Sequence, residues 1–199
     1  MKIKNLTSCA KDDMAFTLLD ETDNEGQIVR QYVMLSERAI YPLDGLPIMS
    51  EHALMTVMDI PPDRQSCWNV NRAVMNERTK AMMADAKVTD VELDMCYIGI
   101  AMNGVGVQPV LGRGANDSVG FVESDLLKVL ADYRDLTIAE RRVDGSRVYV
   151  MLNGMCNVGC LMPTKAQWSK FAARQLAQVG EEAARVYERW DEETERTHG

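Results

Sequence analysis

The sequence predicts an α+β fold in which antiparallel sheets pack with short helices and a long amphipathic helix follows at the C-terminal end. Three observations lead to this fold class. Short runs of alternating apolar residues, typical of half-buried strands, are separated by turn dipeptides such as Asn-Gly and Asp-Gly. Serines that can cap a helix precede two short helix-forming segments. Beyond Pro163 the apolar residues recur every three or four positions, which is the helical period.

Length and composition restrict the class of protein. The chain has 199 residues, of which 46% are hydrophobic, and its formal net charge is −8. The hydrophobic fraction is too high for a disordered chain. No run reaches the roughly 18 consecutive apolar residues of a membrane helix, and the first residues lack the apolar stretch of a signal peptide. We therefore expect a soluble, cytoplasmic, globular protein with no membrane association.

The N-terminal part predicts a hairpin and a short helix. Two alternating runs, 14–19 and 27–35, flank a turn sequence and predict two antiparallel strands. Ser50 can cap a short helix that runs to about Asp59, where two prolines follow.

The middle of the chain predicts a helix, an extended region, a second capped helix and a meander. The composition of 71–86 favours a helix, whereas 88–110 alternates and is expected to be extended. Ser124 can cap an amphipathic helix that ends near Tyr133. The three strands expected after it are 136–142, 147–152 and 155–162.

The C-terminal segment, 164–199, predicts one long amphipathic helix. Apolar residues spaced by three or four form a single stripe from Trp168 to Trp190, although Gly180 interrupts the helix in its middle. Such a stripe can pair with a second copy in a homodimer or with another partner. The alternative is that the helix packs entirely on its own sheet.

We expect residues 1–163 to form an α+β body. Two segments in it, 48–59 and 121–132, both run from extended chain through a cap into a helix. The body therefore suggests two pseudo-repeats, 12–111 and 116–163.

The second pseudo-repeat resembles a known module. A strand leads into a helix with Leu126, Leu127 and Leu130 on one face, and a meander then ends at Leu161-Met162-Pro163. This order resembles the strand–helix–strand–strand–strand unit of the DNA sliding clamps, which implies a clamp-like accessory factor of DNA metabolism. Clamps line their DNA channel with Lys and Arg, but the helix at 124–134 is nearly neutral, so encirclement of DNA does not follow.

The negative charge is concentrated in residues 12–63, which carry eleven acidic and two basic side chains. Such a field repels nucleic acid and favours a protein partner with a basic surface. A solvated acidic surface that only keeps the protein soluble is the simpler alternative. The candidate partner-binding residues are Asp12, Asp13, Asp20, Glu21, Asp23 and Glu25, together with Trp168 and Trp190 of the C-terminal stripe.

The sequence predicts no catalytic residue, metal site or cofactor. The five cysteines read as free buried thiols, and His52 is the one internal histidine available to activate Cys67 or Cys96. Three carboxylates that alternate along an expected strand could in principle serve a hydrolase, although a half-exposed strand explains them equally well: Asp90, Glu92 and Asp94.

These features favour a non-enzymatic protein that acts through protein–protein contacts. A small, acidic, Met-rich chain without a catalytic motif has the character of an accessory or inhibitor protein from a phage or mobile element. One specific form is an acidic DNA mimic that occupies the basic nucleic-acid channel of a defence protein, as anti-CRISPR-type proteins do. The alternatives are the clamp-like factor and, in third place, a small hydrolase.

Overall fold

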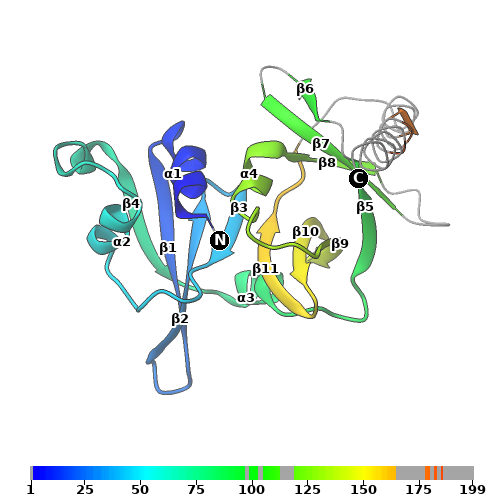
Figure 1. Cartoon of the computed structure of the whole chain (residues 1–199). Helices are drawn as coiled ribbons and strands as arrows, with labels where there is room; N and C mark the ends of the chain where they lie inside the picture. Colours follow the sequence, from blue (N-terminus) through cyan, green and yellow to red (C-terminus); the bar gives the residue numbers. More distant parts are fainter. Residues whose placement is uncertain are drawn as a thin grey trace, which may run out of the picture. The chain divides into compact units, whose positions relative to one another are not determined.

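Strands dominate the described part of the chain (Figure 1). The computed structural model describes residues 2–96, 99–102, 105–112 and 119–164, together with 178, 179, 182 and 185. The helices are α1 (Ile3–Lys11), α2 (Glu51–Val57), the 3-10 helix η1 (Pro62–Cys67), α3 (Glu77–Met83) and α4 (Ser124–Lys128). The strands are β1 (Ala15–Thr22), β2 (Ile28–Leu35), β3 (Ala39–Pro42), β4 (Asn69–Val74), β5 (Val91–Met95), β6 (Ile100–Met102), β7 (Val105–Gly112), β8 (Val119–Glu123), β9 (Leu136–Val143), β10 (Ser146–Asn153) and β11 (Cys156–Leu161).

The chain forms two compact units. The first, Met1–Glu92 with Asp125–Pro163, contains seven strands in the order β4-β1-β2-β3-β11-β10-β9. In the second unit, β7 pairs antiparallel with β5, β6 and β8. The features discussed below lie in the first unit.

Helices cover both faces of the first unit's sheet. On one face, Met82 and Met83 of α3 pack into a buried apolar cluster with residues of β1, β2, β3, β9, β10 and β11. On the other face α1 and α4 lie side by side, since the Lys2 N–H donates to the Val129 carbonyl at 2.9 Å. Gly159 of β11 allows Leu130, just after α4, to pack closely on the sheet. A Cβ at Gly159 would lie 3.2 Å from side-chain atoms of Leu130 and Tyr41.

The first unit repeats one order of elements. A helix followed by three antiparallel strands occurs as α1-β1-β2-β3 and again as α4-β9-β10-β11. The two repeats join where β3 pairs with β11, so the strand order is mirrored about that pair. Strand β8 directly precedes α4, so the order β8-α4-β9-β10-β11 is the strand–helix–strand–strand–strand order predicted for 116–163. The clamp-like pseudo-repeats 12–111 and 116–163 stay a prediction.

The predicted fold class is wrong in its sheet. The sequence predicted antiparallel sheets, but β4 pairs parallel with β1, so the sheet is mixed. Residues 71–74, predicted as helix, belong to β4 instead. The Met75 N–H donates to the Asp20 carbonyl at 2.9 Å and the Arg72 side chain binds the Asp20 carboxylate at 2.6 Å, so tertiary contacts override the local helix propensity.

The predicted helix content is also wrong. The helix predicted to end near Tyr133 ends at Lys128, and the longest helix in the described residues is α1, with nine. The long C-terminal helix is not part of the described structure, since most of 165–199, including Trp168 and Trp190, lies outside the described residues. Val179, which the predicted stripe would bury, is 57% exposed. The predicted boundary between 1–163 and 164–199 stays a prediction for the same reason.

Other elements are confirmed. β1 and β2 form the predicted antiparallel hairpin, and β9, β10 and β11 form the predicted meander. Ser50 caps α2, because its Oγ accepts the Ala53 N–H at 3.3 Å. In the described part of the chain, no helix combines the length and apolar character that crossing a membrane requires.

Candidate functional site: an apolar cavity beside helix α1

A hollow in the first unit lies beside α1. Lys4, Thr7, Ser8 and Lys11 line it, and their spacing of three, four and seven residues places them on one face of the helix. The opposite face of α1 is buried in the core, through Leu6, Cys9 and Ala10. The helix is thus amphipathic, and its polar face looks onto the cavity.

The facing wall comes from the segment between α2 and β4. Met58, Ile60 and Pro61 follow α2, and Trp68 follows η1. The Trp68 ring packs against Phe16 of β1, with centroids 6.2 Å apart, and this contact fixes the position of the indole.

One hydrogen bond holds the two walls together. The Thr7 hydroxyl donates to the Met58 carbonyl at 2.8 Å. The cavity is open to solvent on one side, and its volume is about 600 Å³, within the range of ligand pockets in proteins. The remaining lining residues are Met14, Asp59, Arg64 and Cys67.

The rim of the cavity is positively charged. Lys4 and Lys11 of α1 and Arg64 of η1 stand against one carboxylate, Asp59. We call these three basic residues the rim cations. None of them forms an ion pair with another described residue, whereas nine other basic side chains of the described chain do: Lys2, Arg30, Arg38, Arg72, Lys80, Lys128, Arg141, Arg142 and Arg147. An apolar cavity with unpaired cations at its opening suits an apolar group that carries negative charge nearby.

None of the candidate acidic residues lines the cavity, although Asp12 and Asp13 stand between the lining residues Lys11 and Met14 in the chain. Four of the six candidate acids make contacts inside the protein. Asp13 accepts a hydrogen bond from Arg38 at 2.8 Å, and Glu21 accepts one from the Tyr32 hydroxyl at 2.6 Å. Asp23 accepts the backbone N–H groups of two residues in the β1–β2 turn at 2.9 Å each.

Asp20 is the most deeply placed of these acids. It is 5% exposed, and its carboxylate accepts hydrogen bonds from the Gln31 amide at 2.7 Å and from Arg72 at 2.6 Å. The hydrogen bond with Asp20 is also the main cause of the raised pKa of Arg72. Asp12 and Glu25 are exposed. The two tryptophans predicted to bind a partner, Trp168 and Trp190, lie outside the described residues.

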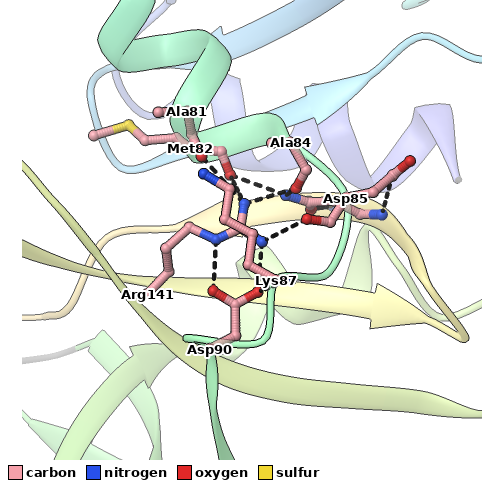
Figure 2. Close-up of polar contacts among 9 residues, drawn as sticks. Ala81, Met82, Ala84, Asp85, Lys87, Asp90 and Arg141 are labelled. Atoms are coloured by element: carbon pink, nitrogen blue, oxygen red, sulfur yellow. Dashed lines mark hydrogen bonds and ion pairs between the residues drawn. The ribbon is translucent and has the colours of Figure 1, made fainter.

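A second polar cluster surrounds Arg141 of β9 (Figure 2). Its guanidinium donates to both carboxylate oxygens of Asp90, at 2.8 and 2.6 Å. It also donates to the carbonyls of Met82 at 3.0 Å, Ala84 at 2.6 Å and Asp85 at 2.9 Å, at and just beyond the C-terminal end of α3. Carbonyls at a helix end have no partner within the helix, so Arg141 satisfies them.

This cluster fixes the role of Asp90. Burial raises the pKa of Asp90, but hydrogen bonds from Arg141 and from the Lys87 backbone N–H outweigh that effect, so the pKa lies below its usual value. An ionised carboxylate held by a buried arginine stabilises the fold. Asp90 lies before β5, so the hydrolase alternative loses one of its three expected strand carboxylates.

The cysteines are free thiols, as predicted, but they are not all buried. Cys67 and Cys156 are exposed, and Cys9, Cys96 and Cys160 are buried. Burial raises the pKa of Cys160 to about 12. His52, on α2, is not a lining residue of the cavity that contains Cys67. In the described ranges, no three His, Cys, Asp or Glu side chains are grouped to hold a metal ion.

Comparison with known proteins adds no neighbour, since no family model, no curated protein and no solved structure matches the chain.

The amphipathic pattern of residues 1–11, which form the helical wall of the cavity, is visible in the sequence but not in the overall composition. Residues 1–11 carry three lysines, and the polar residues among them follow the helical spacing described above. A helical wheel of this segment would have revealed its amphipathic character. The contribution of Arg64 and Trp68, more than fifty residues later in the chain, depends on tertiary structure.

Proposed function

We propose that this protein is a non-enzymatic binding protein, and that the cavity beside α1 holds apolar side chains of a protein partner. The observation that supports this proposal is an open cavity of about 600 Å³ lined by Met14, Met58, Ile60 and Trp68. Met14 is 46% exposed there. An exposed methionine such as Met14 adapts to different apolar partners, and tryptophan is enriched among the residues that dominate binding energy at interfaces.

The proposal keeps the predicted class of function, a non-enzymatic binding protein, but places the binding surface at the cavity beside α1 instead of at the acidic residues. A DNA-mimic inhibitor requires acids that face solvent. Asp12, Asp13, Asp23 and Glu25 are exposed and meet that requirement, although Asp13 and Asp23 also accept hydrogen bonds within the protein, whereas the buried Asp20 serves the fold. The inhibitor of a defence protein, with a basic partner, therefore stays a prediction that rests on fewer residues than the sequence suggested.

A displayed library of random peptides, selected against the full chain, tests the proposal. Ser8 lines the cavity and is exposed, so Ser8→Trp fills the space, whereas Ser8→Ala leaves it open. We expect peptides with apolar residues that bind the native chain and Ser8→Ala but not Ser8→Trp. Absence of enriched peptides, or equal binding to both variants, would contradict the proposal.

A second block guards against a folding defect in Ser8→Trp. Cys67 lines the cavity, and Cys156, the other exposed thiol, is not among the lining residues. A bulky maleimide on Cys67, in a Cys156→Ser chain, should abolish binding of the selected peptides. The same reagent on Cys156, in a Cys67→Ser chain, should leave binding intact. Equal effects of the two labels would exclude the cavity as the binding site.

A further inference from the structure

The rim cations show what kind of partner the cavity accepts. Lys4, Lys11 and Arg64 have no ion pair among the described residues, although the protein carries an excess of acidic side chains. The protein as a whole is negatively charged, but the residues that line this opening carry more positive than negative charge. The local field there favours an approaching negative charge.

The placement of the charges distinguishes a chain segment from a single anionic group. Lys4 and Lys11 are seven residues apart on one helix, which separates them by about 10 Å along its axis. Arg64 lies on the facing wall. A small molecule with one carboxylate or phosphate could satisfy one of these cations, whereas carboxylates spread along a peptide segment can reach several.

The lining adds the second requirement. Besides the charged residues, Met58, Ile60, Pro61 and Trp68 line the cavity, together with Met14. Met58 and Ile60 are buried, whereas Met14, Pro61 and Trp68 present apolar surface to solvent. A ligand that satisfies only the cations would leave this apolar surface in contact with water. A segment that alternates acidic residues with one or more large apolar residues satisfies both.

We propose that the cavity recognises an acidic, amphipathic segment of a partner protein, with apolar side chains inserted between α1 and η1 and carboxylates facing the rim cations. This inference rests on the proposed function and adds the charge of the partner. The predicted partner was one with a basic surface, so the charge of the partner is the point that an experiment must decide.

Synthetic peptides provide the test. The strongest cavity-dependent peptide from the library is made in three versions, in which the residues flanking the apolar ones are Glu, Gln or Lys. Fluorescence anisotropy measures binding of each to the full chain at low and at physiological salt, and decanoate serves as a small anionic competitor. We expect the Glu version to bind about tenfold more tightly than the Gln version at low salt, with the advantage shrinking as salt rises.

Variants of the rim cations assign the effect to this site. The triple change Lys4→Gln, Lys11→Gln and Arg64→Gln should erase the preference for Glu, whereas Arg134→Gln should preserve it, because Arg134 is an exposed cation that does not line the cavity. Binding that is blocked by Ser8→Trp yet equal for the Glu and Gln versions would overturn the inference and leave the proposed function standing. Tighter binding of the Lys version, or displacement by decanoate as effective as by the Glu peptide, would also overturn it.

Discussion

Two groups of basic side chains in the first unit are used in opposite ways. Arg141 is 2% exposed and donates hydrogen bonds to Asp90 and to carbonyls at and just beyond the end of α3. The rim cations are exposed and make no ion pair with the described residues. Arg141, on β9, contacts the end of α3, whereas Lys4 and Lys11 lie on one face of α1. Both sites involve a short helix, but within the described residues only Arg141 has protein groups as partners.

The difference teaches which charges the fold requires. Removal of Arg141 would leave the buried Asp90 carboxylate without its cation and would remove hydrogen bonds to the carbonyls at the end of α3, which is costly in a low-dielectric interior. Removal of a rim cation would leave no buried group unpaired. Charges that the fold does not require are those available to a partner, and stability measurements can separate the two groups without knowledge of that partner.

The largest expected effect is that of Arg141→Met. We expect the free energy of unfolding to fall by about 3–5 kcal/mol, because the change breaks a buried ion pair from one side. Urea denaturation followed by circular dichroism measures it. The matched control is Arg142→Met, since Arg142 is the neighbouring residue, pairs with Glu140 and has a side chain that is 70% exposed. Its effect should stay within about 1 kcal/mol, and equal losses in the two variants would show that burial of Arg141 does not matter.

The next effect concerns the acids that the sequence placed at a partner surface. Asp20→Asn replaces a buried, charged acceptor of hydrogen bonds from Gln31 and Arg72, so we expect a loss of about 1.5–3 kcal/mol in urea denaturation. Asp12→Asn, at an exposed site, should change stability by less than about 0.5 kcal/mol. If Asp20→Asn proved as silent as Asp12→Asn, Asp20 would be free to serve a partner after all.

A pH series sharpens the role of the Arg141 cluster. The pKa of Asp90 is lower in the folded protein than its usual value of about 3.9, so folding favours the ionised carboxylate over the protonated one. Its contribution is complete above that unfolded-state pKa and is lost as the pH falls through the lower folded-state pKa. The stability gap between the native chain and Asp90→Asn should therefore narrow below about pH 4. A gap that does not change between neutral and acidic pH would contradict the lowered pKa.

Local patterns were enough to predict some elements and not others. The β1–β2 hairpin and the β9–β10–β11 meander are confirmed because their turns and alternation are encoded within a few residues. β4 was missed because its residues favour a helix locally, and its parallel pairing with β1 is decided by residues some fifty positions away. The burial of Arg141 was not predicted either, because the α3 carbonyls that bind its guanidinium lie far from it in the sequence.

One repeated tetrapeptide shows the limit clearly. Tyr-Val-Met-Leu occurs in β2, from Tyr32, and again in β10, from Tyr149. Tyr32 packs in the cluster beneath α3, and its hydroxyl binds Glu21. In β10 the neighbours Val148 and Val150 occupy that cluster, so Tyr149 points to the opposite face. Its buried hydroxyl has no hydrogen-bond partner among the described residues, and burial raises the pKa of Tyr149 to about 12. Identical residues thus have different environments, because strand register decides the face.

The smallest stability effect is expected at the rim of the cavity, and it is the most informative for function. Lys4 lies in the first turn of α1, where a positive charge is unfavourable, and Lys11 lies in the last turn, where it is favourable. Their replacement by Gln should therefore have opposite effects that nearly cancel, and Lys4→Gln with Lys11→Gln should change the free energy of unfolding by less than about 0.5 kcal/mol. The same pair of changes should weaken binding of an acidic peptide. A loss of stability comparable to that of Asp20→Asn would show that these lysines serve the fold, and the contrast with Arg141 would disappear. Unchanged stability with weakened binding is the combination expected only of charges that are kept for a partner.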